Sequence, residues 1–137
     1  MPKFGKKSLE RLDTCHKDIQ TLMFWVIKTW DCTILEGHRG RQAQDKAVAD
    51  GRSKTPWPKS LHNRFPSWAV DVAPYPIDWE NRERFAMFVG FVLATALELK
   101  EQGKIKASFR SGMDWNKNGD PKDDGWDAPH IEITEEG

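Results

Sequence analysis

Three residues far apart in the sequence have side chains that together suit a divalent metal ion. His62 lies late in a proline-rich segment, Asp71 lies within an apolar stretch, and His130 begins the last apolar stretch. Two imidazoles and one carboxylate leave a fourth position around zinc for water, which distinguishes catalytic from structural zinc. Zinc lowers the pKa of its bound water to about 7, so hydroxide becomes available at neutral pH. The three residues are therefore candidate zinc ligands.

A carboxylate close to this set is a candidate general base. Asp127 stands three residues before His130, and Pro129 restricts the backbone between them. A carboxylate beside such a water can take its proton and pass it to a leaving amine. Considered singly, His62 could be an ordinary surface histidine, and His130 could be a hydrogen-bonded residue at the end of a strand. From spacing alone, such roles are more common than zinc binding. Asp71 is harder to explain without a partner, because burying a carboxylate is costly.

Periodic apolar patterns predict the elements that must position these residues. Apolar residues recur every three or four positions over 8–30, which predicts a helix, or two short helices with a break near Asp13–Thr14. Further helices are predicted for 41–50, followed by Gly51, and for 79–102, capped by Asp78 and ended by Gly103. Strands are predicted for 32–36, 68–73, 105–110 and 130–134.

Two long segments connect these elements and bring the candidate residues to them. Residues 52–67 contain three prolines and predict a loop, and residues 111–128 are rich in Gly, Asp and Asn. Helices and strands are segregated rather than strictly alternating. The pattern predicts an α+β fold with a small antiparallel or mixed sheet of about four strands and helices packed against it. With 137 residues and no internal repeat or linker, the sequence predicts a single domain, 1–137.

The composition excludes several classes of protein. Lys plus Arg and Asp plus Glu number 21 each, which argues against a main role in binding nucleic acid phosphates. The charge is uneven, however, with a net of +6 over residues 1–64 and −6 over residues 114–137. The longest apolar run, 85–97, is too short to span a membrane, and no signal peptide is visible. Cys15 and Cys32 are expected to be reduced and packed.

Several motifs resemble one family in order along nearly the whole chain. The motifs Ser60-Leu61-His62, Ala69-Val70-Asp71 and Asp127-Ala128-Pro129-His130-Ile131-Glu132 look like those of the zinc peptidases of the D-alanyl-D-alanine carboxypeptidase superfamily. The pattern of that superfamily is S-x-H-x-x-G-x-A-x-D, followed by an acid three residues before a second His. The closest resemblance is to tailed-phage endolysins that act as L-alanyl-D-glutamate endopeptidases. It extends to the stretches 4–8, 36–39, 71–74, 77–79 and 114–116.

The resemblance implies a role for each motif residue and a hedgehog/DD-peptidase-like fold. His62, Asp71 and His130 would be the zinc ligands and Asp127 the general base. Arg39 matches the family arginine, which binds a substrate carboxylate or stabilises the developing oxyanion, although an ordinary ion pair is an alternative. Ser60 would orient His62 or the substrate from outside the ligand set.

Two departures from the family pattern affect these assignments. The stretch between His62 and Asp71 is two residues longer than usual and lacks its glycine, so residues 63–67 must loop out for both ligands to reach one ion. The candidate base is Asp, whereas the carboxypeptidase and dipeptidase branches have Glu. Because the endopeptidase branch also has Asp, this departure favours that branch.

A second stretch resembles the first half of a calcium loop. Asp114, Asn116, Asn118 and Asp120 have the spacing of D-x-[DN]-x-[DN]-G, but Gly125 occupies the position of the bidentate glutamate. Asp123 or Asp124 could substitute for it. An acidic, turn-rich loop without an ion is the favoured interpretation.

The sequence therefore predicts a zinc endopeptidase that cuts the peptidoglycan stem peptide for host lysis. The alternatives are a D-alanyl-D-alanine carboxypeptidase or dipeptidase on the same scaffold, and a non-catalytic, zinc-containing cell-wall binding module. A nucleic-acid role is the weakest candidate. The basic first half of the chain would instead attract the protein to an anionic cell envelope. We expect a monomer without a separate wall-binding domain, located in the host cytoplasm before lysis and needing a separate protein to reach the wall.

Overall fold

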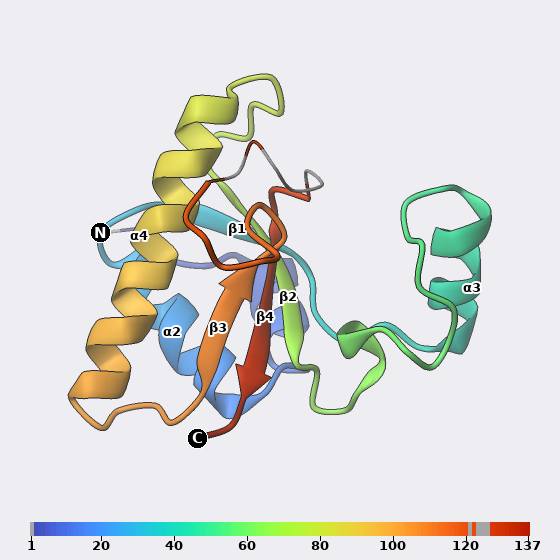
Figure 1. Cartoon of the computed structure of the whole chain (residues 1–137), viewed down its shortest axis with the longest axis horizontal. Coiled ribbons are helices and arrows are strands. Elements are labelled where there is room, and N and C mark those ends of the chain that lie inside the picture. Colours follow the sequence, from blue (N-terminus) through green and yellow to red (C-terminus); the bar gives the residue numbers. More distant parts are fainter. Residues whose placement is uncertain (1, 121, 123–126) are drawn as a thin grey trace.

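The computed structural model describes residues 2–120, 122 and 127–137 and has an α+β fold (Figure 1). Its helices are α1 (Lys6–Leu12), α2 (Lys17–Ile27), α3 (Arg41–Ala49) and α4 (Arg82–Glu101), with a short 3₁₀ helix, η1 (Leu61–Asn63). Its strands are β1 (Cys32–Glu36), β2 (Ala69–Pro74), β3 (Ser108–Ser111) and β4 (His130–Glu135). The predicted fold class is confirmed.

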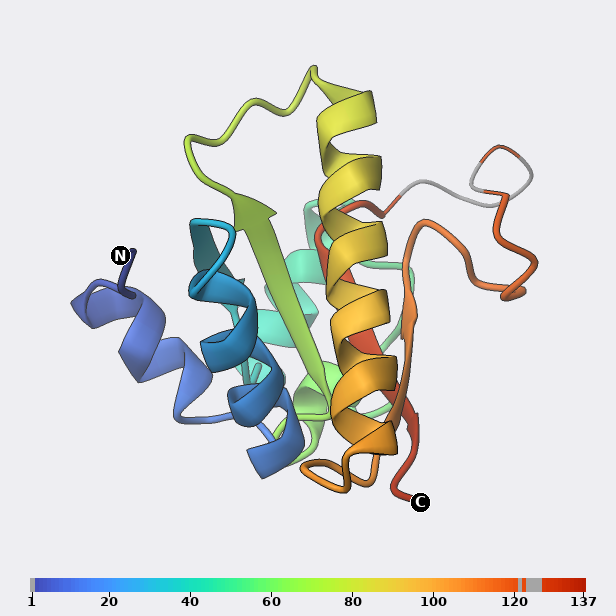
Figure 2. The same ribbon diagram turned by 90° about the vertical axis from the view of Figure 1, so that its left-hand side faces the viewer.

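The strands form one antiparallel sheet in the order β1-β2-β4-β3. On one side, α2 packs against α4, which in turn contacts β2 and β3, while α1 packs against β1 (Figure 2). Val70, Val72, Ile131 and Ile133 join the helices in one buried hydrophobic cluster. Because side chains alternate along a strand, the residues between them on β2 and β4 face the other side.

Helix α3 and its flanking loops lie on that other side and stand apart from the helical layer (Figures 1 and 2). The side of the sheet that carries Asp71 and His130 is therefore bordered by irregular chain rather than covered by a long helix. Loops placed on a rigid sheet are a common setting for functional residues.

The segment 8–30 forms two helices, α1 and α2, in agreement with the alternative prediction of a break near Asp13–Thr14. The His16 amide donates to the Ser67 carbonyl at 2.8 Å, and the His16 ring accepts the Asp18 amide at the start of α2. The turn between α1 and α2 thereby pairs with the end of the proline-rich segment. This pairing anchors that segment close to β2.

Two predicted element starts were wrong, and both have local causes. Helix α4 begins at Arg82 because Asn81, not Asp78, accepts the amide of Arg84. Strand β3 begins at Ser108 rather than Ile105. The buried Asp18 carboxylate accepts the amides of Lys106 and Ala107 at 2.9 and 3.0 Å, so that segment bonds to α2 instead of a neighbouring strand.

Both cysteines are free and buried, as expected. Burial raises the pKa of the Cys15 and Cys32 thiols to about 12. Neither is therefore available as a thiolate ligand at neutral pH.

Candidate metal centre

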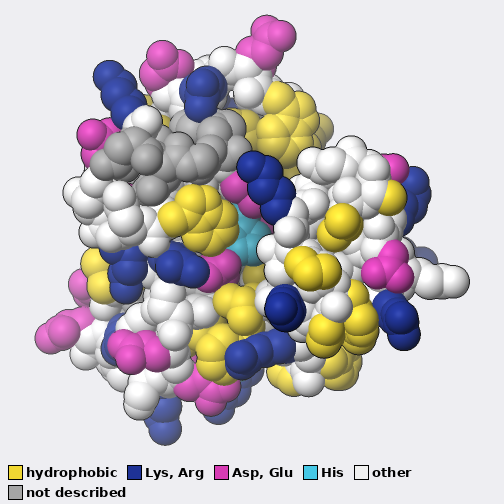
Figure 3. Space-filling view, turned by 45° about the vertical axis from the view of Figure 1, so that its right-hand side comes forward, with side chains coloured by type: hydrophobic (Ala, Val, Ile, Leu, Met, Phe, Trp, Pro, Cys, Tyr) yellow, Lys and Arg dark blue, Asp and Glu magenta, His cyan; other side chains and the backbone are white. Residues whose placement is uncertain are grey.

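The three candidate ligands converge on the side of the sheet away from α2 and α4. Antiparallel pairing places Asp71, in the middle of β2, opposite His130, the first residue of β4. His62 comes from η1 and is almost completely buried. Histidine atoms are recessed at the centre of this face, among hydrophobic and charged side chains (Figure 3). The predicted convergence of a loop, a central strand and a strand end is thus present.

The distances between the donor atoms fit one metal ion. Asp71 Oδ1 lies 3.2 Å from His62 Nε2 and 3.3 Å from His130 Nδ1. One ligand atom from each of the three residues lies within 4.8 Å of the others. Tetrahedral zinc with bonds of 2.0–2.1 Å holds its ligand atoms about 3.3 Å apart. The donor set and spacing therefore suit zinc.

The second nitrogen of each imidazole is already bound, which determines the nitrogen left for a metal. His62 Nδ1 lies 2.8 Å from the Gly37 carbonyl, and His130 Nε2 lies 2.7 Å from Glu132 Oε1. Both acceptors require a proton on the nitrogen they contact. His62 Nε2 and His130 Nδ1, which face Asp71, are thereby the unprotonated nitrogens of the neutral rings. Partners of this kind orient histidine ligands in metal sites.

Charges within the centre alter its protonation in the metal-free protein. Burial alone would raise the pKa of Asp71, but hydrogen bonds and charge from His130 and His62 lower it well below its usual range. Burial alone would lower the pKa of His130, but hydrogen bonds to Asp71 and Glu132 raise it to about 9. Without a metal, a proton on His130 compensates the buried carboxylate. A divalent cation would replace that proton.

Asp127 lies near this cluster and retains contact with solvent. Its amide donates to the Gly112 carbonyl at 3.0 Å, and its carbonyl accepts the amide of His130 at 3.2 Å. Partial burial of the carboxyl group and the negative charge of Asp71 raise its pKa, against the opposing positive charges. A Cβ atom on Gly112 would overlap the Asp127 backbone, so a glycine is needed beneath this residue.

Arg39 lies beside Asp71 but is held by other side chains. Nε donates to Glu36 at 2.9 Å and Nη1 donates to Gln44 at 3.0 Å, while Nη2 lies 3.9 Å from Asp71 Oδ2. The side chain is 10% exposed. It places a positive charge next to the ligand set, and substrate contact by this residue stays a prediction.

Ser60 supports the backbone of η1. Its hydroxyl accepts the amide of His62 at 3.2 Å as part of a capping box with Asn63. The predicted outward loop over 63–67 contains fewer exposed residues than expected. Only residues 64–66 are exposed, whereas Ser67 is buried and Asn63 donates to the Arg39 carbonyl and to Gln44. These bonds connect η1 to the arginine segment.

The calcium-like stretch has no support as a cation site. Asp114 accepts the amides of Asn118 and Gly119, and the Asn118 side chain accepts the amide of Asp120. Asn116 accepts the Asn118 amide as well. Asp123, Asp124 and Gly125 lie outside the described residues. Within the described chain, the one cluster of three or more His, Cys, Asp and Glu ligands is His62, Asp71 and His130.

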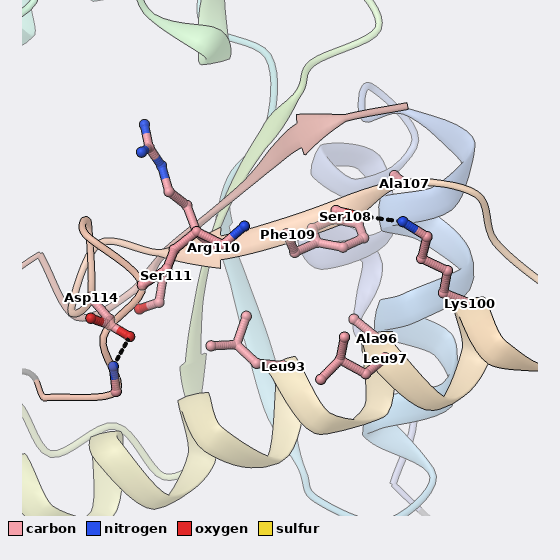
Figure 4. Close-up of a pocket in the computed structure, with 12 residues that line it drawn as sticks. Leu93, Ala96, Leu97, Lys100, Ala107, Ser108, Phe109, Arg110, Ser111 and Asp114 are labelled. Carbon is pink, nitrogen blue, oxygen red and sulfur yellow. Dashed lines mark hydrogen bonds between the residues drawn. The ribbon is translucent and has the colours of Figure 1, made fainter. Parts of the chain in front are cut away.

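A separate cavity of about 310 Å³ lies between α4 and β3 (Figure 4). Its lining includes Leu93, Leu97 and Phe109, and it contains none of the candidate zinc ligands.

The groups that bind the second nitrogen of each candidate histidine ligand are not among the residues predicted from the sequence. Glu132 follows His130 by two residues, so the period of a strand predicts that both lie on the same face. The roles of the Gly37 carbonyl and of the buried Gln44 have no comparable signal, because both depend on contacts between distant segments.

Two comparisons with known proteins give matches for this chain. The model of a family described as phage L-alanyl-D-glutamate peptidase matches residues 1–134. The crystal structure of the Serratia marcescens L-Ala D-Glu endopeptidase ChiX is similar, with a TM-score of 0.66 and 21% identity over 96% of this chain and 90% of that chain. At this identity the likeness shows a shared fold. No curated protein matches the sequence, and among the described residues no helix has the length and apolarity needed to cross a bilayer.

Proposed function

The chain belongs to the phage L-alanyl-D-glutamate peptidase family, and on this premise we propose that it is a zinc-dependent endolysin. Its substrate is the peptidoglycan stem peptide, in which it hydrolyses the L-alanyl-D-glutamate bond and so causes lysis of the bacterial cell. The observation that carries the zinc assignment is the approach of His62 Nε2 and His130 Nδ1 to one oxygen of Asp71.

His62, Asp71 and His130 would hold the ion. When bound, zinc supplies a water molecule of lowered pKa and polarises the scissile carbonyl. The ring contacts with Gly37 and Glu132 keep the ligand nitrogens directed at the ion. The buried Asp71 contributes the negative charge that the cation needs.

Asp127 would act as general base and then as general acid. It accepts a proton from the attacking water as the water oxygen bonds to the L-alanyl carbonyl carbon. It then donates that proton to the D-glutamyl nitrogen as the carbon–nitrogen bond breaks, which leaves a carboxylic acid and an amine. The carboxylic acid loses its remaining proton to solvent at neutral pH. In the metal-free protein, burial and the negative charge of Asp71 raise the pKa of this carboxyl group of Asp127. A pKa nearer the working pH suits a group that both accepts and donates a proton.

Arg39 would provide positive charge for the substrate. The guanidinium is fixed by Glu36 and Gln44, so its charge is placed without further ordering. Either the oxyanion that develops on the carbonyl or a free carboxylate of the stem peptide would benefit. Ser60 would act indirectly, by holding the backbone of His62.

Mass spectrometry of digested peptidoglycan tests the proposal. Purified sacculi are treated with the protein as isolated, after chelation, and after zinc is restored. We expect scission between L-Ala and D-Glu, loss of activity with the chelator, and recovery with zinc. Release of terminal D-Ala would instead indicate a carboxypeptidase, and zinc binding without any cleavage would indicate a binding module. The monomeric state is tested separately, by light scattering of the zinc-loaded protein.

A further inference from the structure

Arg110 on the edge strand β3 is connected to His130 although it lies outside the predicted site. Its side chain leaves the cavity between α4 and β3 and extends on the opposite side of the strand (Figure 4). The sheet register pairs Arg110 with Glu132. The arginine therefore lies on the face that carries the candidate ligands.

A chain of charged hydrogen bonds leads from this arginine to the ligand. Arg110 Nε donates to Glu132 Oε2 at 2.9 Å, and the other oxygen of Glu132 lies 2.7 Å from His130 Nε2. The Glu132 side chain is 9% exposed, so both of its oxygens are committed within the protein. Because one carboxylate bridges both residues, fixing Arg110 also fixes the rotation of the His130 ring.

The same arginine holds an aromatic ring against the histidine. Arg110 Nη1 donates to the Trp115 carbonyl at 3.2 Å, and its guanidinium lies 5.2 Å from the centre of the Trp115 ring. The Trp115 ring lies 5.3 Å from the His130 ring, at an interplanar angle of 42°. His130 is thus constrained by Glu132 at its edge and by Trp115 against its ring.

We propose that Arg110 is a positioning residue for the metal centre, which directs His130 Nδ1 at the ion through Glu132 and Trp115. A half-turn of the ring would place a carbon where Nδ1 now faces Asp71, and the protein would lose one of its three ligands. This inference rests on the proposed zinc site. An ordinary cross-strand ion pair would contribute to stability alone.

Metal affinity measured by competition with a chromophoric chelator tests this role. We expect Arg110→Gln to weaken zinc binding about 10- to 100-fold, in line with other losses of outer partners. Arg110→Lys should restore part of the affinity, since an ammonium can pair with Glu132 but cannot also hold Trp115 as a guanidinium does. Arg84→Gln is the matched control, because Arg84 also donates to backbone carbonyls, those of Tyr75 and Pro76, and neither is a ligand or a partner of one.

A second measurement reports on the ring without any metal. Nuclear Overhauser effects between the His130 and Trp115 rings should be present in the metal-free wild type and in Arg84→Gln, and be lost in Arg110→Gln. Wild-type zinc affinity in Arg110→Gln, or an equal loss in Arg84→Gln, would overturn the inference. If Arg110→Gln does not fold, Glu132→Gln replaces it and should weaken binding similarly. Absence of zinc binding by the wild type would refute the proposed function, while the ring contacts would still decide the role of Arg110.

Discussion

Substitution of Asp127 should separate zinc binding from catalysis. It is near the ligand cluster but is not among the atoms that face the ion. Asp127→Asn should therefore retain the zinc affinity of the wild type and lose about 10²- to 10⁴-fold in kcat, the usual contribution of a general base. Hydrolysis is measured on purified muropeptides, with Asp120→Asn, an exposed aspartate of the preceding loop, as control. Unchanged turnover in Asp127→Asn would remove it from the mechanism.

His130 makes metal binding depend on pH. In the metal-free protein its pKa is raised to about 9, so the ring is charged at pH 7 and must lose its proton before Nδ1 can bind zinc. The apparent affinity should increase with pH up to about 9, with roughly one proton released per zinc at pH 7. Calorimetry in two buffers of different ionisation enthalpy measures this number.

The raised pKa of His130 also makes the stability of the metal-free protein depend on pH, but stability decreases with pH whereas zinc affinity increases. A raised pKa stabilises the folded state fully below the unfolded value of about 6.5, and this contribution is lost as the pH rises through about 9. Metal-free protein should therefore become less stable over this range while zinc binds more tightly. A zinc affinity that does not vary between pH 7 and 9 would contradict the assignment of His130.

At the scale of elements, the segment after β1 must approach α1 closely to support the centre. A Cβ atom on Gly37 would overlap the Arg11 carbonyl and the Thr14 hydroxyl, and the Gly37 carbonyl contacts the His62 ring. Gly37→Ala should lower the free energy of unfolding by about 1–3 kcal/mol, as overpacking does, and should also weaken zinc binding. Urea denaturation and chelator competition measure the two effects.

Gly90 provides the contrasting substitution. It lies in α4 with open space around its Cβ position. Gly90→Ala should keep zinc affinity and raise stability, by up to about 1 kcal/mol, because alanine favours a helix. If Gly37→Ala and Gly90→Ala had the same effects on stability and zinc affinity, the close approach at Gly37 would not explain them.

At the scale of the whole molecule, positive charge collects around α3. Residues 39–64 contain seven Lys and Arg against two Asp and Glu, and all but Arg39 of these cations are exposed. Lys3, Lys6 and Lys7 are also exposed and lie near the N-terminus, before α1 and in its first turn. Arg39 is buried and contributes little to the surface charge.

Lysis should therefore depend on ionic strength. Raising salt from about 0.01 to 0.15 M shortens the Debye length from about 30 to 8 Å and should slow the clearing of cell suspensions. The double variant Lys54→Glu/Lys59→Glu should show a slower, less salt-dependent rate on cells and unchanged hydrolysis of soluble muropeptides. Clearing rates that do not vary with salt would contradict this attraction.

Most elements and the three candidate metal ligands are predictable from the amino-acid sequence. Local patterns predict the bounds of β1 and the existence of β2 and β4, because burial of one face is encoded in neighbouring residues. They give the division between α1 and α2 only as an alternative to one long helix. The spacing of His62, Asp71 and His130 was recognised from motifs. The start of β3 was missed, since it depends on Asp18, which lies far away in the sequence.

The contacts that support the candidate ligands become visible only in the folded structure. The Gly37 carbonyl, the Arg39–Gln44–Asn63 bonds and the Arg110–Glu132 pair each join segments that are separated in the chain or by strand register. Hydrogen bonds require a donor and an acceptor within about 3 Å, and no local pattern encodes such a meeting between distant segments. The chemistry was therefore visible in residue types, whereas the orientation of each ligand depended on the folded sheet.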